Sequence, residues 1–342
     1  MKKKVLFIMN PISGAKKKAA IPEMIEKYID KDVFEYAIAK TEYAGHATEI
    51  AAKAAQEGVD IVVAIGGDGT VNEVGKGIVN TNTALSIIPT GSGNGLARHL
   101  AIPLNVKKSI EILNQTTIKS LDYGLINNIP FFCTCGMGFD AFISMKFAEA
   151  GKRGPITYVQ KILEEGLSYE PQTYEIEDDE GIHKYKAFLV SVANASQYGN
   201  NAYIAPQASM SDGLLDVIIM EPFDILEASH VAFEMFNKTI DKYQKIKTFK
   251  AKRILIHRKQ AGVIHFDGDP IMADADIEVK VINKGIKVVV NPSDKRISRK
   301  PNIIQTAFSE LFCNIDEIRY NINKQSRKMQ AINKNLLRKI KI

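Results

Sequence analysis

Long apolar runs and cysteines are both scarce in this chain of 342 residues. No stretch approaches the roughly 20 apolar residues that a membrane-spanning helix needs, which excludes a membrane-spanning protein. The apolar segment after residues 2–4 is too short for a signal peptide and ends at Asn10-Pro11, so it predicts a buried strand. Three cysteines cannot form a disulfide framework, and we expect buried thiols, with Cys133 and Cys135 on one face of a strand.

Positive charge is concentrated near the C-terminus. The net charge is +6, whereas residues 295–342 hold twelve Lys and Arg against three acids, which is +9 and leaves −3 for the rest. Apolar residues recur at gaps of three and four over 302–342, a pattern that predicts a basic amphipathic helix. This helix should pack on the body or on a second copy of the chain, or lie on an anionic surface, either membrane or nucleic acid.

Two patterns of secondary structure divide the rest of the chain. Residues 1–122 alternate apolar strands with amphipathic helices, which predicts a parallel sheet covered on both faces. Residues 123–291 carry more strand signals than helical ones, among them 277–282 and 286–290, and predict a β-sandwich-like domain. The predicted fold class is therefore α/β, with a parallel-sheet nucleotide-binding domain and a β-sandwich-like second domain.

The strongest motif is Gly66-Gly67-Asp68-Gly69-Thr70, which stands between a buried strand and a helix. Its glycines allow a tight turn with exposed N–H groups, and the helix N-terminus adds partial positive charge, so phosphate is the natural ligand. Thr70 and Glu73 have the spacing of a capping box. A carboxylate at Asp68 beside phosphate makes electrostatic sense with Mg²⁺ between them. The alternative is a turn with a purely structural role.

Similar loops follow the other predicted strands of the first domain. Asn10, Pro11, Ser13 and Gly14 follow the first strand, Thr41 follows the second, and the loop of residues 91–94 follows the fourth. Because the carboxyl ends of parallel strands meet at one edge of a sheet, these loops should converge on one nucleotide phosphate site. The signatures of P-loop, dinucleotide-binding and protein-kinase folds are absent from the sequence.

These motifs resemble the diacylglycerol kinase catalytic domain, which is shared with sphingosine and ceramide kinases and soluble bacterial lipid kinases. The resemblance covers about residues 3–292 and extends to three later motifs, Gly136-x-Gly138-Phe139-Asp140, Ser211-Asp212-Gly213-x-x-Asp216 and Asp267-Gly268-Asp269. It implies a two-domain lipid kinase that binds ATP in the cleft between its domains. It also implies that the chain returns to the first domain near 292–301.

The resemblance further assigns roles to single positions. Nucleotide or phosphate contacts are implied for the loop residues Asn10, Pro11, Ser13, Gly14, Thr41, Gly66, Gly67, Asp68, Gly69, Thr70, Ser92 and Asn94, with Glu73 as a support. Asp68 and Asp122 would hold or orient Mg²⁺. A structural Mg²⁺ is implied at the turn of residues 211–213, bound by the carbonyls of Ser209 and Leu214 and by the carboxylate of Asp212.

Asp269 is the main departure from the family pattern, which usually has a Glu at this position as general base. Asp269 can still accept a proton, but its side chain is one methylene shorter. We expect transfer of the γ-phosphate of ATP, with Mg²⁺, to the hydroxyl of a diacylglycerol, a sphingoid base or another lipid alcohol. Two alternatives remain: an NAD kinase, which shares the Gly-Gly-Asp-Gly-Thr turn, and a catalytically weak lipid or nucleotide sensor.

A lipid substrate adds an expectation about location. Such an enzyme should be cytoplasmic and peripheral at the membrane, so an anionic bilayer, not nucleic acid, is the expected partner of the basic segment at 302–342. A homodimer formed through the same segment is the competing expectation.

Overall fold

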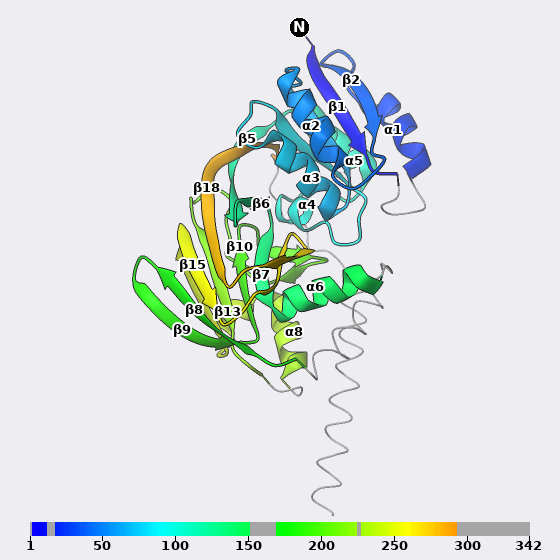
Figure 1. Ribbon diagram of the computed structural model, residues 1–342. Helices are drawn as coiled ribbons and strands as arrows, with labels where there is room; N and C mark the ends of the chain where they lie inside the picture. The colour runs from blue at the N-terminus through cyan, green and yellow to red at the C-terminus, as the bar shows by residue number, and fades with distance from the viewer. Residues whose placement is uncertain (1, 12–17, 151–168, 224–226, 293–342) are drawn as a thin grey trace, which may run out of the picture.

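The computed structural model describes residues 2–11, 18–150, 169–223 and 227–292, which are coloured in Figure 1. The N-terminal part is an α/β unit with parallel strands in the order β2–β1–β3–β4. The strands are β1 (Lys3–Met9), β2 (Phe34–Lys40), β3 (Ile61–Gly66) and β4 (Ala84–Pro89). The helical segments are η1 (Lys18–Ala20), α1 (Ile21–Tyr28), α2 (His46–Gln56), α3 (Asp68–Ile78), α4 (Gly95–His99) and α5 (Val106–Gln115).

The inner strands β3 and β4 are buried along their whole length because helices cover both faces of the sheet. Strand β3 is buried along its whole length, and its residues alternate between two cores. Val62 and Ala64 belong to the core that contains α2 and α3, whereas Val63 and Ile65 belong to the core that contains α1 and α5. Polar side chains of this sheet can therefore meet a ligand only at the ends of the strands, where the loops begin.

A second sheet packs against an extension of the first one. The second sheet has the order β14 (Ile246–Ala251), β13 (Leu215–Met220), β10 (Leu189–Ala193), β7 (Thr134–Gly138), β16 (Gly262–Phe266) and β17 (Asp269–Ala273). The extension contains β15 (Arg253–Arg258), β8 (Gln172–Asp178) and β9 (Gly181–Ala187). Both sheets contribute to one apolar core, with Val190 and Val217 from one and Ile254 and Ile176 from the other, so this part is a β-sandwich.

One long strand, β18 (Asp276–Val289), joins the two parts of the molecule (Figure 1). Its beginning pairs antiparallel with β15, and its end pairs parallel with β4 through Lys287 and Val288. Strand β5 (Ile118–Ile126) runs antiparallel beside it and also pairs with the short β6 (Ile129–Phe131). The first sheet is thus continuous from the α/β unit into the sandwich.

Strand β18 corrects two details of the sequence prediction. The predicted strands 277–282 and 286–290 are one strand, with an irregularity where Lys284 has a φ of 53°. The chain is already beside β4 at Lys287, before the segment 292–301 in which the return was expected. From residue 293 onward, including the predicted helix at 302–342, the chain lies outside the described residues.

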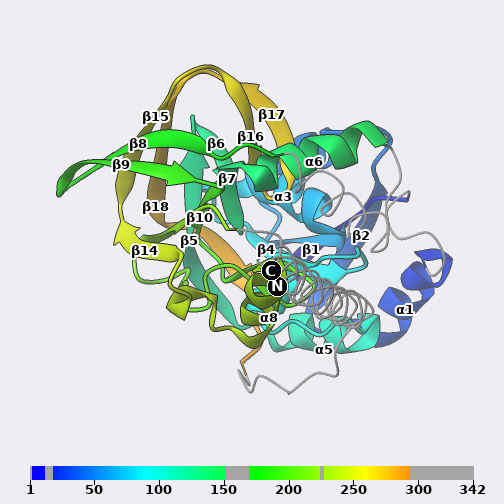
Figure 2. The same cartoon turned by 90° about the horizontal axis from the view of Figure 1, so that it is seen from below.

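Helices cover the outer face of the second sheet (Figures 1 and 2). They are α6 (Phe139–Ala150) and α8 (Ala228–Asn237), which is followed by η2 (Ile240–Lys242). Ile143 of α6 and Val231 of α8 share a core with Ile218 and Met220 of β13. A small hairpin, β11 (Gln197–Gly199) and β12 (Ala202–Tyr203), completes this part. No helix in the described part of the chain is long and apolar enough to cross a membrane.

The two cysteines near β7 are buried free thiols, as expected, but they do not share a face. Cys133 packs in the core of the α/β unit, whereas Cys135 packs in the core of the sandwich. The reason is that β7 begins only at Thr134, so the alternation of a strand does not extend back to Cys133. Burial raises the pKa of both thiols well above the ordinary value, which makes them poor nucleophiles. Cys313 lies outside the described residues.

Candidate functional site

The loops that follow the four parallel strands meet at one edge of the sheet. Asn10, Thr41 and Thr90 each donate a backbone N–H to a carbonyl at the end of a neighbouring strand, at 3.3, 3.0 and 2.8 Å. The side-chain amide nitrogen of Asn10 also lies 3.5 Å from the hydroxyl oxygen of Thr70. The ends of β1, β2, β3 and β4 are therefore held together as one loop cluster.

Glycines let two of these loops touch. A Cβ on Gly91 would lie 2.4 Å from the Cα of Gly67, and a Cβ on Gly66 would lie 2.3 Å from the side chain of Thr70. A Cβ on Gly69 would meet nothing within 4 Å, so α3 has open space beside Gly69 in its first turn. Open N–H groups at a helix N-terminus are suited to bind phosphate.

Helix α3 begins earlier than the sequence predicted. It starts at Asp68 with Gly67 as N-cap, so Thr70 lies inside the first turn and no capping box forms. The Glu73 carboxylate instead accepts the N–H of Ala47, at 3.2 Å, in the first turn of α2. Glu73 therefore ties the start of α2 to α3, beside the turn of residues 66–70.

Asp68 joins the two glycine loops. Its Oδ2 accepts the N–H of Asn94 at 2.8 Å, and its Oδ1 accepts the N–H of Gly95 at 2.6 Å. Enclosure of the carboxyl raises the pKa of Asp68 to about 6; the two N–H donors oppose this shift, and the charge of Asp267 adds to it. The Asp68 carboxylate is thus fixed and enclosed beside the N-terminus of α3.

Asn94 shapes the second glycine loop. Its side chain accepts the N–H of Gly91 at 3.0 Å and donates to the carbonyl of the same residue at 2.7 Å. Asn94 has a φ of 54° and is buried, whereas Ser92 is exposed at the tip of the loop. Asn94 therefore organises the loop, and Ser92 is the member whose side chain is open to a ligand.

Lys18 is a further cation beside the first loop. It is buried and donates a hydrogen bond to the carbonyl of Asn10. Burial lowers the pKa of Lys18 to about 8. Pro11 is exposed in the same loop, and Ser13 and Gly14 lie outside the described residues.

A segment of the sandwich lies directly on this loop cluster. Asn200, after β11, donates its N–H to the carbonyl of Gly93 at 3.1 Å, and Arg98 of α4 donates to the side chain of Asn201 at 3.2 Å. A Cβ on Gly199 would lie 2.9 Å from the Cα of Gly93. No local sequence signal marks these contacts, because they join positions about 100 residues apart.

The hairpin between β16 and β17 brings two further aspartates to the same region. Asp267 has a φ of 50° and turns its carboxylate inward. It accepts the Asn72 amide at 2.8 Å and three successive backbone N–H groups, of residues 132–134, at 2.9, 2.7 and 3.1 Å. Burial raises the pKa of Asp267, and these four donors lower it. Asp267 therefore anchors the hairpin to α3.

Asp269 faces the other way. It is the first residue of β17, directly opposite Phe266 in the hairpin, and it is exposed. Since its neighbour Asp267 is enclosed by donors, Asp269 is the carboxylate of this motif that a second substrate can reach.

Lys76 is a residue that the sequence analysis missed. It lies one helical turn after Asn72 on the same face of α3, and its Nζ is 4.2 Å from the centre of the Phe266 ring. Burial lowers the pKa of Lys76; the charges of three carboxylates oppose this shift, with that of Asp269 first, then those of Asp267 and Glu73. The sequence did hold one indication of this: Lys76 follows Asn72 by four residues, which places both residues on the same face of a helix.

Asp122 is not part of this cluster. It is fully buried on β5, where its Oδ1 accepts the N–H of Lys284 at 2.7 Å and its Oδ2 accepts the N–H of Gly213 at 2.8 Å. Its own N–H donates to the carbonyl of Met210 at 2.7 Å. The structure places Asp122 with the irregularity of β18 and the 211–213 turn, apart from the loops that hold Asp68.

The turn that was expected to hold a structural Mg²⁺ contains a lysine ammonium. Asp212 Oδ1 accepts the N–H of Leu214 at 3.1 Å, and Asp212 Oδ2 lies 2.8 Å from the Nζ of Lys250. The same Nζ lies 3.1 Å from Asp216. Ser209 uses its hydroxyl within the turn, 3.2 Å from that of Ser211.

Comparison with known proteins accounts for both parts of this arrangement. Residues 4–126 match the diacylglycerol kinase catalytic domain, and residues 134–290 match the YegS C-terminal NAD kinase beta sandwich-like domain. The chain belongs to the diacylglycerol kinase catalytic-domain family. It is therefore a member of a lipid kinase family.

The sequence alignments with known relatives extend over most of the chain. The diacylglycerol kinase of Staphylococcus saprophyticus is 28% identical over 274 residues, which is 79% of this chain and 90% of that one. The diacylglycerol kinase of Bacillus subtilis is 28% identical over 273 residues, with 78% and 90% covered. A crystal structure of a diacylglycerol kinase from Bacillus anthracis shares the fold, with a TM-score of 0.65 at 21% identity over 85% of this chain and 98% of that one.

The residues present fit Mg²⁺ at one of the two expected places. In the described ranges, no three His, Cys, Asp or Glu side chains form a metal site by themselves. Asp68 is nevertheless an enclosed carboxylate whose pKa a second carboxylate raises, and Mg²⁺ is commonly held by one or two carboxylates together with substrate phosphates. At the 209–214 turn, the Nζ of Lys250 lies 2.8 Å from the Asp212 carboxylate and 3.1 Å from that of Asp216, so an ammonium already takes the place of a cation and a metal ion does not fit that conformation.

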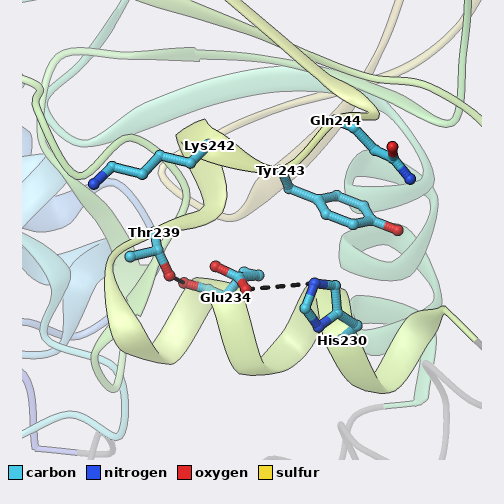
Figure 3. Close-up of a pocket in the computed structure, with 6 residues that line it drawn as sticks. All are labelled: His230, Glu234, Thr239, Lys242, Tyr243 and Gln244. Atoms are coloured by element: carbon cyan, nitrogen blue, oxygen red, sulfur yellow. Dashed lines mark hydrogen bonds and ion pairs between the residues drawn. The ribbon is translucent and has the colours of Figure 1, made fainter.

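A pocket of about 510 Å³ lies elsewhere in the kinase, on α8 and the following turn (Figure 3). It is lined by His230, Glu234, Thr239, Lys242, Tyr243 and Gln244. The Nε2 of His230 is 3.4 Å from Glu234, and the imidazole packs edge-on against Tyr243 at 5.1 Å. None of these residues contributes to the glycine loops or to the hairpin, so the pocket is separate from the candidate active site.

Proposed function

We propose that the chain is an ATP-dependent kinase that transfers the γ-phosphate of ATP to the hydroxyl of a lipid alcohol, such as a diacylglycerol or a sphingoid base. One observation carries the proposal: α3 presents its open N-terminus to the glycine loops and holds the Asp269 hairpin through Asn72. A phosphate-binding end and an exposed carboxylate are thus fixed to one helix. Relatives named diacylglycerol kinase favour a lipid as acceptor.

The nucleotide would bind along the loop cluster of the α/β unit. Its phosphates would lie at the open backbone of Gly69, with Ser92 and Lys18 close enough to add a hydroxyl and a positive charge. Asn10 and Asn94 would shape the loops, since their side chains already bond within the cluster. Mg²⁺ bound with ATP would neutralise phosphate charge beside Asp68.

The chemical step would use Asp269 as general base. Its carboxylate takes the proton of the lipid hydroxyl while that oxygen forms a bond to the γ-phosphorus. The bond from the γ-phosphorus to the bridging oxygen breaks, and ADP leaves with the electron pair. Backbone N–H groups at the start of α3 would stabilise the negative charge on the transferred group.

The test is a transfer assay with labelled ATP. The protein is incubated with Mg²⁺ and a panel of lipid alcohols in mixed micelles, and the labelled product is identified. We expect a phosphorylated lipid. Labelled NADP in a parallel reaction with NAD would indicate an NAD kinase, and ATP binding by calorimetry without transfer to any acceptor would indicate a sensor.

The basic segment at 302–342 would hold the enzyme at a membrane surface. Deletion of residues 302–342 should weaken binding to anionic vesicles, because each basic residue near an anionic bilayer contributes about 1 kcal/mol, an attraction that salt screens. Vesicle sedimentation at two salt concentrations measures this, with neutral vesicles as control. Unchanged sedimentation with a lower oligomeric mass would assign the segment to a homodimer instead.

A further inference from the structure

The face of α3 that meets the sandwich carries two polar residues one turn apart. Asn72 reaches the inner carboxylate of the hairpin, that of Asp267, at 2.8 Å. Lys76 reaches the next position along the hairpin, with its Nζ 4.2 Å from the ring of Phe266. Phe266 is paired directly with Asp269 across the two strands. The ammonium of Lys76 therefore lies beside the strand pair that ends in the exposed carboxylate.

This part of the site is rich in negative charge. The charges of Asp68 and Asp267 interact with each other, and Asp269 is two residues beyond Asp267. Neighbouring carboxylates disfavour one another's ionised form, whereas a nearby cation favours it. A general base must be ionised to accept a proton, and phosphates bring further negative charge when ATP binds. A fixed cation at this place would therefore favour the ionised form of the nearby carboxylates.

The position of Lys76 suits that task. It is half-buried, its ammonium packs on an aromatic face, and its helix is the one that starts at the phosphate loops. Asp269 is first among the carboxylates whose charge acts on Lys76. A short carboxylate has fewer rotatable bonds with which to find the acceptor, so its placement depends more on what surrounds it.

We propose that Lys76 is a positioning residue for Asp269: its ammonium holds the exposed carboxylate ionised and in place at the hairpin tip, where it meets the acceptor hydroxyl. The inference rests on the proposed function and deepens it. It assigns to α3 a third contribution, beside phosphate binding and anchoring of the hairpin.

The test is a double-mutant cycle on turnover, with Lys76→Met, Asp269→Asn and the double variant. Removal of a general base costs about 10²- to 10⁴-fold, and a residue that acts only through the base cannot cost more. We expect Lys76→Met to lower kcat by about 10- to 100-fold with little change in KM for ATP, and to have no further effect once Asp269 is Asn. Multiplicative losses in the double variant would overturn the proposal.

Two further variants separate charge from structure. Lys76→Arg keeps the charge and should retain kcat within about fivefold. Lys53→Met in α2 removes an exposed lysine that lies 3.8 Å from Glu57 of its own helix, and it should leave kcat unchanged. A Lys76→Arg variant as slow as Lys76→Met would also count against the proposal.

Thermal unfolding of the same four proteins distinguishes this proposal from the proposed function. Non-additive unfolding temperatures would demonstrate an energetic coupling between Lys76 and Asp269 without reference to activity. Absence of turnover by the unmodified protein on every lipid would overturn the proposed function, and the positioning role with it. Turnover by the unmodified protein, with multiplicative losses of kcat in the double variant, would overturn the role of Lys76 alone.

Discussion

The molecule contains two clusters in which a lysine faces aspartates, and the two are built for different ends. At the α3–hairpin contact, Lys76 lies beside a hairpin whose Asp269 is exposed. At the 209–216 turn, Lys250 lies within 2.8 and 3.1 Å of Asp212 and Asp216, and the other oxygen of Asp212 is taken by a backbone N–H. In the first cluster Asp269 is exposed, whereas in the second Asp212 and Asp216 are both paired with Lys250.

The difference shows what an aspartate in a glycine-rich turn can mean. Asp267 and Asp212 both sit beside a glycine, yet each is bound by donors of its own protein. Asp269 is two residues from Asp267 and points to solvent. The donors around Asp267 and Asp212 identify these two residues as anchors, whereas Asp269 is marked out by its exposure.

The largest effect on the open cluster should come from Asp68→Asn, which keeps the size of the side chain but removes its charge. Turnover should fall by at least about 10³-fold, because the fixed carboxylate beside the phosphates is lost. Circular dichroism should still report a folded protein. Turnover within tenfold of the unmodified protein would remove Asp68 from the mechanism.

Asp269→Asn should reduce kcat by about 10²- to 10⁴-fold with little change in ATP affinity, since the residue faces the acceptor. Asp269→Glu lengthens the side chain to the usual family length and should retain or raise activity. Steady-state kinetics with the lipid found in the transfer assay measures both variants. If the Asn variant turns over as fast as the unmodified protein, the base must be another group.

The closed cluster should respond in stability and not in chemistry. Lys250→Met should lower the free energy of unfolding by about 1 to 2 kcal/mol, because it leaves the partly buried Asp216 without its cation. That corresponds to a fall of about 2 to 6 °C in the unfolding temperature. Without nucleotide, the unmodified protein should unfold at the same temperature in EDTA and in Mg²⁺, since Lys250 supplies the charge.

Lys247→Met is the matched control for this comparison. Lys247 lies on the same strand, 2.6 Å from Glu221, but the pair is exposed and should contribute less than about 0.5 kcal/mol. A saturable rise in unfolding temperature with Mg²⁺ that Asp212→Asn abolishes would instead show that a metal displaces Lys250.

The smallest effect concerns Lys18 and pH. Because burial lowers its pKa to about 8, Lys18 is charged below that pH and loses its attraction for phosphate as the pH rises through it. ATP should bind about threefold more weakly at pH 9 than at pH 7.5, and Lys18→Gln should show little of this change. Calorimetric titration at the two pH values measures it, and equal slopes for both proteins would contradict it.

The sequence predicted the part of the site that is made of local motifs. Each glycine loop follows its own strand directly, so the edge on which they meet could be inferred from the alternation of strands and helices alone. The hydrogen bonds that could not be predicted join residues far apart in the sequence. Asn72 and Asp267 are 195 residues apart, and Asp122 reaches Lys284 over 162 residues.

Predictions from local sequence pattern also failed where the hydrogen-bond partner of a side chain comes from a distant part of the chain. Glu73 has the right spacing for a capping box with Thr70, but the N–H group that it accepts belongs to α2. Asp122 has the charge of a metal ligand, but it is fully buried, and its oxygens accept the N–H groups of Gly213 and Lys284, which tie β5 to the 211–213 turn and to β18. A sequence shows which groups need hydrogen-bond partners, whereas only the packed fold decides which partner each one finds.

The pairing of β4 with β18 has a consequence for how the chain is made. The edge of β4 is closed by residues 287 and 288, about 200 positions after Ala84. At typical synthesis rates of about 5 to 20 residues per second, that edge stays open for about 10 to 40 s on the ribosome. An open parallel edge is a template for pairing with other chains. The β4 edge of the nascent α/β unit is therefore open to pairing with other chains during synthesis, and delivery of β18 closes it.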